Sequence, residues 1–190
     1  MREQGVAVKI MTSALEASDV TMVYTAYTHH RRALLRAGIE LYEYKGQPAL
    51  TRSERKWYRR PRLSSSALHS KAIVFDRQRV WIGSFNLDPR SVSLNTEIAV
   101  LVQSDQLAAQ MADYIAEDFS PRRSWRVQLE KSTVFPPVPP RRGNSVREHI
   151  TWTGESNGKL SKRYRQPAAS GWQRFKEFLY SLVPGIESQL

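Results

Sequence analysis

The sequence contains no cysteine. A chain without cysteine has no disulfide framework and no thiolate zinc site, and this absence leaves its redox compartment open. The four histidines are scattered and lack the spacing of metal ligands. We therefore expect no bound metal and no other cofactor.

Long hydrophobic runs are also absent. No uninterrupted apolar stretch approaches the ~18 residues that a membrane-spanning helix needs. The N-terminal segment MREQGVAVKIMTSALEAS lacks the apolar region of a signal peptide. These features predict a protein that is soluble or associated with the surface of a membrane.

Negative charge is scarce relative to positive charge. The chain has 29 Lys and Arg against 18 Asp and Glu, which gives a net charge of +11. This excess favours a polyanionic partner, either nucleic acid or the anionic head groups of a membrane. At 190 residues, with 41% hydrophobic and 10% aromatic residues, the chain is long and apolar enough for one sizeable core.

Hydrophobic periodicity predicts a strand, a helix and a second strand near the N-terminus. The strands are expected at 6–10 and 39–44, and the helix at 28–37, where Gly38 stops it. A βαβ unit of this kind indicates an α/β fold.

Three more strands and a helix are expected further along. Residues 71–76 and 79–84 form a predicted hairpin around an Arg-Gln pair, although this pair lacks the favoured turn residues. A strand at 97–102 follows, and Ser104 then caps an amphipathic helix.

The composition changes after residue 120. Residues 121–150 hold five of the ten prolines, which indicates an extended Pro/Arg-rich segment on the surface. A last amphipathic helix is expected at 172–183. The chain is therefore expected to divide into a domain at 1–120, the extended segment at 121–150, and a tail with a helix at 151–190.

Polar side chains stand at the open end of the predicted hairpin. Side chains two apart on a strand point to the same face, so His69 and Lys71 lie together. Ile73 and Phe75 are expected to continue this face into the interior.

The other arm of the hairpin ends in Ser84 and Asn86, again two residues apart. If the arms pair, an imidazole, an ammonium, a hydroxyl and a carboxamide meet at one end of a sheet. Lys71 then supplies charge to phosphate oxygens, to which Ser84 and Asn86 supply neutral donors. Gly83 permits close approach of the backbone.

The histidine is the expected reactive group. With an ordinary pKa of about 6.5, the imidazole of His69 suits nucleophilic attack or proton transfer near neutral pH. It needs an orienting partner. Glu97 opens the next strand and is the carboxylate expected to hold its second ring nitrogen.

Taken singly, these residues have simpler explanations. A histidine at a strand start is usually an exposed or packed residue, Lys71 is typical of a solvated edge, and Gly-Ser-x-Asn is often a turn. Asp76 is most simply a hairpin residue that bonds nearby amides. Their combination favours a phosphate site.

That combination resembles a known family. The spacing of His69, Lys71, Asp76, Ser84 and Asn86 resembles the complete HKD signature of the phospholipase D superfamily. Similarity to its bacterial cardiolipin synthase branch extends through LDPRSVSLNTEIAV, which has Asn-x-Glu after the motif. It extends further through GVAVKIMTSALEASDV, LLRAGIELYEY and the tail GWQRFKEFLYSLVPGIESQL, and so covers nearly the whole chain.

The resemblance implies a fold and a chemistry. The fold is an α/β half-domain at 1–120 with a mixed β-sheet flanked by helices. The reaction is metal-free transfer of a phosphatidyl group through a phosphohistidine, with phosphatidylglycerol as the substrate. Glu97 orients His69, which is the nucleophile or the general acid/base, and Asp76 supports the structure rather than touching substrate. The implied catalytic residues are His69, Lys71, Asp76 and Glu97, and the implied phosphate-binding residues are Lys71, Ser84 and Asn86.

The second HKD motif of the family's synthases is missing from this sequence. Neither His29-His30 nor His149 rebuilds it. The resemblance therefore implies the C-terminal part of a two-motif synthase, or a chain that pairs with a copy of itself across a twofold axis. Loss of an N-terminal strand is expected to expose an apolar sheet edge and to lower solubility.

Two functions other than lipid transfer remain open. The first is a homodimeric HKD phosphodiesterase that acts on nucleic acid, since the basic loop at 51–63 carries Trp57 and Tyr58, which would stack on bases. The second is a catalytically silent fragment that keeps the fold but lacks a partner motif.

A membrane surface is the partner we favour for the positive charge. The helix at 172–183 carries an aromatic stripe beside Arg174 and Lys176, which suits a helix at a lipid interface, although such stripes also pack on their own domain. The expected location is peripheral, at the cytoplasmic face of a bacterial inner membrane.

Overall fold

The computed structural model describes residues 5–18, 21–46, 68–86, 91, 94–132, 147–167 and 170–182. The predicted basic loop at 51–63 lies outside these residues. The strands are β1 (Lys9–Ser13), β2 (Glu40–Tyr44), β3 (Ala72–Phe75), β4 (Arg79–Gly83), β5 (Ala99–Gln103), β6 (Ser124–Ser132), β7 (Arg147–Ser156) and β8 (Lys159–Arg163). The helices are α1 (Thr21–Arg36), α4 (Asp105–Ala116) and α5 (Gly171–Ser181), with short 3-10 turns η2 (Leu15–Ala17) and η3 (Glu117–Phe119).

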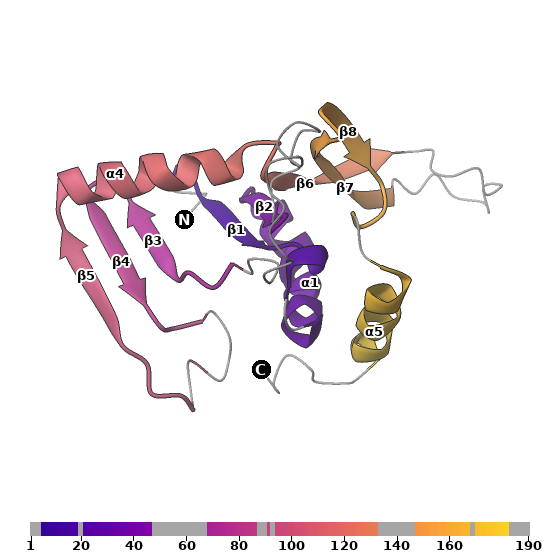
Figure 1. The fold of residues 1–190 in the computed structure, drawn as a ribbon, viewed down its shortest axis with the longest axis horizontal. Coiled ribbons are helices and arrows are strands. Elements are labelled where there is room, and N and C mark those ends of the chain that lie inside the picture. The colour runs from indigo at the N-terminus through magenta and orange to yellow at the C-terminus, as the bar shows by residue number, and fades with distance from the viewer. Residues whose placement is uncertain are drawn as a thin grey trace, which may run out of the picture.

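The strands form two sheets (Figure 1). The large sheet has the order β1-β2-β6-β7-β8, and the small sheet has the order β3-β4-β5. Strands β1 and β2 are parallel, whereas every other described pair is antiparallel. The expected α/β fold with a mixed sheet and flanking helices is therefore confirmed, with its strands divided between two sheets.

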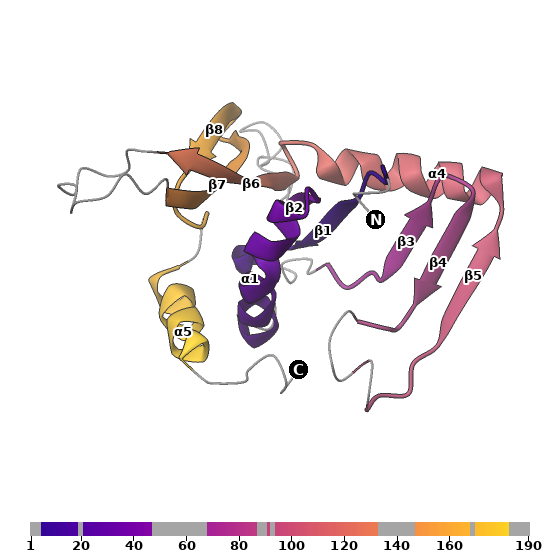
Figure 2. The ribbon, with the colours of Figure 1, turned by 180° about the vertical axis from the view of Figure 1, so that it is seen from behind.

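Helices and turns connect the two sheets. Helix α4 crosses one face of the small sheet and contacts β3 and β4, and η3 then leads the chain into β6. The ring of Phe119 in η3 lies 4.9 Å from the ring of Tyr42 in β2. Seen from behind, α5 lies beside α1, which packs on β2 and β6, and both helices lie away from the small sheet (Figure 2).

The predicted βαβ unit is present as β1, α1 and β2. Its helix begins at Thr21, seven positions before the expected start at Thr28. The first turns of α1, TMVYTAYT, are rich in β-branched and aromatic residues, which have low helix propensity. Burial of Tyr24 and Thr25 against the rest of the protein outweighs that preference.

A buried ion pair joins α1 to the large sheet. Glu43 in β2 is 0% exposed and lies 2.9 Å from the guanidinium of Arg31 in α1. Its carboxylate also accepts hydrogen bonds from Tyr24, Tyr27 and Trp152, at 3.3, 3.2 and 3.0 Å. The three aromatic rings surround Arg31 with centroids 5.0 to 5.5 Å from its guanidinium carbon. Burial alone would lower the pKa of Arg31, but the charge of Glu43 raises it above its ordinary value.

Three strands of the large sheet, β6, β7 and β8, were not expected. The sequence predicted an extended surface segment at 121–150, but Ser124–Ser132 forms β6 between β2 and β7, and this part of the prediction is wrong. Trp125 and Val127 are buried in the core. The prolines of this region flank β6 rather than lie in it, and the alternation of Trp125, Val127 and Leu129 is a strand signal that the composition obscured.

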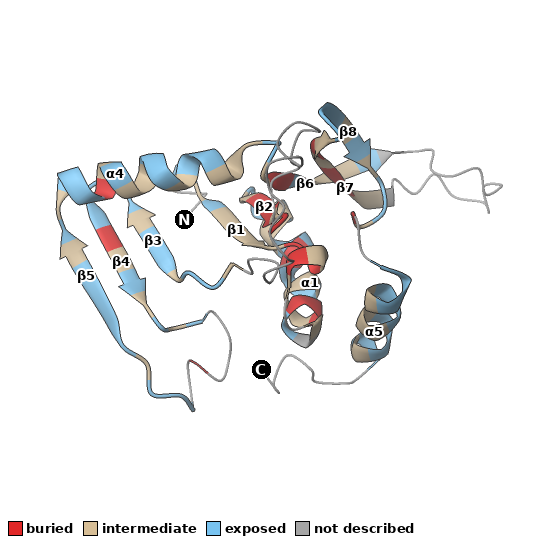
Figure 3. Cartoon of the chain, in the orientation of Figure 1, coloured by how far each residue is buried: buried red, intermediate tan, exposed pale blue. Residues whose placement is uncertain are grey.

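The core lies in the large sheet rather than the small one. The buried positions in Figure 3 gather on β2, β6, β7 and α1. In the small sheet, Val80 is buried where α4 crosses β4, together with Ala108 of that helix.

The opposite face of the small sheet is open and apolar. Register places Ile73, Trp81 and Leu101 side by side on it, and Ile73 and Leu101 are 41% and 59% exposed. Phe75 is 39% exposed. The expectation that Ile73 and Phe75 lead into the interior is therefore wrong, because α4 packs on the other face, at Val80, and leaves this one exposed.

The buried carboxylate predicts a large effect on stability. Glu43→Gln leaves the guanidinium of Arg31 buried without its counter-charge, and we expect the free energy of unfolding in urea to fall by about 3–5 kcal/mol. Glu40→Gln is the matched control on the same strand. Glu40 is partly exposed, and its ion pairs with Lys9 and Arg126 are long, at 4.0 and 3.8 Å. The control should change stability by less than about 0.5 kcal/mol. Equal effects of the two variants would contradict the assignment.

The open face of the small sheet predicts a solubility effect. Leu101 lies on the edge strand β5, so Leu101→Lys should raise the saturation concentration several-fold while leaving the melting temperature nearly unchanged. Gln103→Lys adds the same charge to the same face without removing apolar surface, and we expect a smaller gain. If both variants gain equally, net charge rather than the apolar face limits solubility.

Candidate active site

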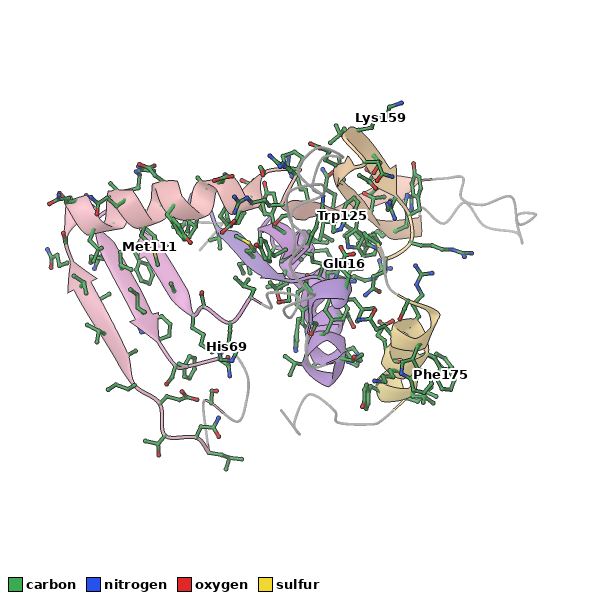
Figure 4. The ribbon with its side chains drawn as sticks, viewed as in Figure 1. Glu16, His69, Met111, Trp125, Lys159 and Phe175 are labelled. Atoms are coloured by element: carbon green, nitrogen blue, oxygen red, sulfur yellow. The ribbon has the colours of Figure 1, made fainter. Side chains whose placement is uncertain are left out.

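The candidate site lies at one edge of the small sheet. Residues 68–71 lead into β3, residues 84–86 follow β4, and residues 94–98 lead into β5. Because the strands are antiparallel, the start of β3, the end of β4 and the start of β5 meet at the same edge. This is the edge away from α4, where Figure 4 labels His69.

His69 and Lys71 are in direct contact. The Nζ atom of Lys71 lies 3.3 Å from Nδ1 and 3.4 Å from Nε2 of His69, and it donates a hydrogen bond to the backbone oxygen of His69 at 3.0 Å. The carbonyl of Lys71 accepts a hydrogen bond from the backbone N–H of Gly83 at 3.1 Å. This bond ties the segment before β3 to the end of β4. His69 is exposed, so its ring is open to a substrate.

Ser84 and Glu97 form the second half of the site. The hydroxyl of Ser84 donates a hydrogen bond to the carboxylate of Glu97 at 2.5 Å. It also accepts one from the backbone N–H of Ile98 at 3.1 Å, while the Ser84 N–H donates to the Ile98 carbonyl at 2.9 Å. The ladder between β4 and β5 thus continues past both strands and fixes Ser84 beside Glu97.

Two further polar residues belong to this edge. Asn95 donates a hydrogen bond to Glu97 at 3.3 Å and lies 3.5 Å from the hydroxyl of Ser91. The same Ser91 hydroxyl accepts a hydrogen bond from the backbone N–H of Asn86 at 3.3 Å. Ser91 and Asn95 were not among the predicted site residues, although Asn95 belongs to the Asn-x-Glu pattern that ends in Glu97.

A glycine allows the strands to approach at this edge. A Cβ atom on Gly83 would lie 2.7 Å from both the Cβ of Ala99 and the backbone oxygen of Ile98. Any larger residue would push β5 away and separate Ser84 from Glu97. Gly83 therefore allows β4 and β5 to pack closely. The sequence had suggested a different role for it, close approach of the backbone to a ligand.

The site is electrostatically organised around Glu97. Hydrogen bonds, first from Ser84 and then from Ser91 and Asn95, lower the pKa of this carboxyl below its ordinary value, and the charge of Lys71 adds to the effect. Glu97 therefore stays ionised in a site that also carries a cation. A carboxylate held this way fixes the direction of the Ser84 hydroxyl.

The structure brings some predicted site residues together and leaves others apart. His69, Lys71, Ser84 and Glu97 lie at one edge, and Asn86 follows in the same segment. The hydrogen bonds described for Glu97 go to Ser84 and Asn95 rather than to His69, so its expected role in orienting His69 stays a prediction.

Asp76 lies elsewhere. It stands in the turn after β3, at the α4 end of the small sheet, with φ of 52°. An extended strand rises about 3.3 Å per residue, so the five steps from Lys71 put the two on the order of 15 Å apart. Asp76 and Arg77, both at positive φ, form the hairpin turn itself, one position before the expected Arg-Gln pair. The N–H of Gln78 closes this turn on the Phe75 carbonyl at 2.9 Å.

The chemistry available at this edge is that of an anion site with a nucleophile. An exposed imidazole lies against an ammonium, and a hydroxyl bound to a carboxylate follows the next strand at the same edge of the sheet. Such groups bind phosphoryl oxygens and attack or protonate the atom they hold. Within the described ranges, no group of three His, Asp or Glu side chains is arranged to hold a metal ion.

Comparison with known proteins identifies the family of this chain. The family model described as "Cardiolipin synthase, PLD-like domain" matches residues 1–119. Cardiolipin synthase C of Escherichia coli is 35% identical over 187 residues, which is 97% of this chain. Cardiolipin synthase A of Yersinia pseudotuberculosis is 31% identical over 144 residues and 70% of the chain. An uncharacterized protein of Helicobacter pylori is 33% identical over 132 residues.

The chain belongs to the phospholipase D-like family of cardiolipin synthases. It spans only 35% of the length of the Escherichia coli relative and 25% of the length of the Yersinia and Helicobacter relatives. No solved structure matches it. Among the described residues, no helix is long and apolar enough to cross a membrane.

The hydrogen bond between Ser84 and Glu97 predicts a titration. The carboxyl of Glu97 should titrate below the usual range of a glutamate, and Ser84→Ala should raise its pKa toward that range because the largest cause of the shift is removed. Side-chain NMR of ¹³C-labelled protein as a function of pH measures both values. Ser181→Ala, in the last turn of α5, is the control and should leave Glu97 unchanged. An identical pKa in the wild type and in Ser84→Ala would refute the arrangement.

Proposed function

We propose that this chain supplies one half of a phosphatidyltransferase site of the cardiolipin synthase type. The observation that carries the proposal is the contact of Lys71 Nζ with both ring nitrogens of His69, at 3.3 and 3.4 Å, on an exposed edge. The Ser84 hydroxyl, just after the adjacent strand, donates to Glu97 in the structure, and in the proposed complex it turns this proton toward a phosphoryl oxygen. Membership in the family supports a phospholipid as the substrate.

The proposed reaction exchanges one phosphoester for another through the histidine. A ring nitrogen of His69 attacks the phosphorus of a phosphatidylglycerol donor, a P–N bond forms, and the P–O bond to the glycerol head group breaks. The hydroxyl of a second phosphatidylglycerol then attacks the phosphorus and releases His69, which yields cardiolipin. Charge on the phosphoryl oxygens is met by Lys71 and by the hydroxyl and amide of Ser84 and Asn86.

This reaction needs a second proton-transferring group. The leaving glycerol must gain a proton, and the incoming hydroxyl must lose one. We assign both transfers to the histidine of a second HKD half, contributed by a longer polypeptide or by a second copy of this chain. If the second histidine is the nucleophile instead, His69 takes the acid/base role. Glu97 has the positioning role in either case, through Ser84 in the structure and through His69 in the proposed complex.

The proposed place of the reaction is the surface of an anionic membrane. A peripheral position at the cytoplasmic face of a bacterial inner membrane suits a net charge of +11, because anionic lipid attracts basic protein surface. The same charge is the observation that favours the second candidate, an HKD phosphodiesterase acting on nucleic acid as a homodimer.

The test is a transfer assay with a histidine variant. We expect the purified chain, alone or together with a second HKD half, to form cardiolipin on phosphatidylglycerol vesicles, as measured by mass spectrometry. His69→Ala should lower the rate by about 10³-fold or more, because it removes the attacking or proton-transferring group. His30→Ala changes a histidine on α1 and should leave the rate unchanged.

The same preparations are incubated with DNA and analysed by light scattering. Cleavage of DNA that depends on His69, without cardiolipin, would show that the lipid assignment is wrong. No activity on either substrate, even with a second HKD half present, would identify a catalytically silent domain. A dimer in light scattering assigns the second histidine to a copy of this chain.

A further inference from the structure

Helix α5 presents its apolar side chains to the outside. Trp172, Phe175, Leu179 and Leu182 are 63%, 48%, 45% and 61% exposed. Their spacing of three, four and three residues places them on one face of the helix. Phe178, which is 57% exposed, widens this stripe. In Figure 4 the labelled Phe175 points away from α1.

The opposite face of α5 is polar, yet it is the face that packs on the protein. Gln173, Glu177 and Tyr180 are half-buried on this face, and α5 contacts α1. Lys176, also half-buried, lies at the border of this face, beside Trp172. The side-chain amide of Gln173 donates to the backbone oxygen of Leu15 at 3.3 Å. A surface helix of a globular protein normally turns its apolar face inward, so the orientation of α5 is reversed. An exposed apolar stripe of this kind is the mark of an interaction surface.

The folded protein fixes this orientation. Ser170 and Gln173 form a capping box at the start of α5. Arg174 donates to the backbone oxygen of Gln166 at 3.2 Å, and the side chain of Gln166 donates to the hydroxyl of Tyr24 at 2.6 Å. Because Tyr24 also bonds the buried Glu43, α5 is anchored to the core and its stripe is held outward.

The charges beside the stripe indicate what kind of partner binds it. Helix α5 carries Arg174 and Lys176, and the Nζ atom of Lys176 lies 5.4 Å from the ring centre of Trp172. Its single acidic residue, Glu177, lies on the half-buried side. Aromatic rings bordered by cations suit the head-group layer of an anionic bilayer, where rings enter the acyl boundary and cations meet lipid phosphates.

The stripe and the candidate active site lie toward the same side of the molecule. In Figure 4 both Phe175 and His69 lie in the lower half of the view, opposite α4 and β8. In the view from behind, α5 and the lower end of β3 again lie in the lower half of the molecule (Figure 2). The segment that leads into β5 reaches the lower edge as well, and there Leu94 and Ile98 are 77% and 76% exposed.

We propose that α5 lies in the head-group layer of an anionic lipid bilayer, with the segment around Leu94 and Ile98 as a second point of contact. The stripe of Trp172, Phe175, Leu179 and Leu182 is buried in the lipid, and Arg174 and Lys176 contact its phosphates. The candidate site then opens toward the bilayer, so phosphatidyl groups reach His69 without leaving the membrane. The choice of lipid rests on the proposed function, whereas the reversed orientation of α5 does not.

Vesicle flotation of the full chain tests the proposal. The probes are phosphatidylcholine vesicles and vesicles of phosphatidylcholine mixed with phosphatidylglycerol in equal parts. We expect binding to the mixed vesicles and at least about tenfold weaker binding after Trp172→Ser, Phe175→Ser and Leu179→Ser together, because apolar surface no longer enters the lipid. Arg174→Gln and Lys176→Gln should each weaken binding about fivefold on mixed vesicles only.

A matched control removes three exposed apolar side chains elsewhere. Leu107→Ser, Tyr114→Ser and Leu160→Ser change residues of α4 and β8, on the far side of the molecule, and should leave vesicle binding unchanged. Circular dichroism checks that all variants are folded. Equal binding by the α5 variant and the wild type, or no wild-type binding to mixed vesicles, overturns the proposal. The proposal is also overturned if light scattering shows a dimer for the wild type and a monomer for the α5 variant, because the stripe would then join two copies of the chain.

The His69→Ala variant separates this proposal from the proposed function. It should bind vesicles as the wild type does and fail to form cardiolipin. If His69→Ala and the wild type both bind through α5 but neither transfers lipid with a second HKD half present, the transferase proposal fails and the membrane contact stands. If transfer depends on His69 but the α5 variant binds and reacts normally, the contact fails and the transferase proposal stands.

Discussion

The carboxylate of Glu43 is the interaction on which the large sheet depends. It is fully buried in β2, and its hydrogen-bond partners come from α1 and β7, more than a hundred residues apart in the chain. An isolated charge in such a place is costly, so every donor around Glu43 must be present at once. The carboxylate therefore couples the N-terminal βαβ unit to the strands that follow α4. Through Tyr24 and Gln166 the same network reaches α5 and sets the direction in which that helix faces.

The candidate site depends on a different constraint, the antiparallel register of the small sheet. Backbone bonds from Gly83 to Lys71 and from Ser84 to Ile98 bring three strand ends to one edge. The close approach at Gly83 lets the Ser84 hydroxyl reach Glu97. The charges at this edge are balanced locally, because the ammonium of Lys71 lies near the ionised carboxylate. Lys71 is held against His69, and the Ser84 hydroxyl against Glu97, before any ligand is bound.

The sequence predicted local features well and long-range ones poorly. The βαβ unit, the hairpin, the helix capped by Ser104 and the last helix follow from periodicity and capping, which are properties of neighbouring residues. The placement of His69, Lys71 and Ser84 at one edge of the small sheet was predicted for the same reason, since strand alternation and pairing fix which residues lie together. Strands β6, β7 and β8 and the first turns of α1 were missed because tertiary packing decides them, as burial of Trp125, Trp152 and Tyr24 shows. No local pattern reveals that the stripe of α5 faces outward, because orientation depends on what the helix packs against.

The residues of the candidate site lie close together in the sequence, and this affects what mutations elsewhere in the protein would do. His69 and Glu97 are only 28 positions apart (97 − 69). Strands β3 and β4 lie between them, and β5 follows directly after Glu97. A meander with such low contact order closes small loops, so it assembles at little entropic cost and independently of distant partners. The large sheet, by contrast, joins segments from both ends of the chain. Mutations that destabilise that sheet would thus lower the amount of protein in the cell, while each molecule that folds would keep its candidate site intact.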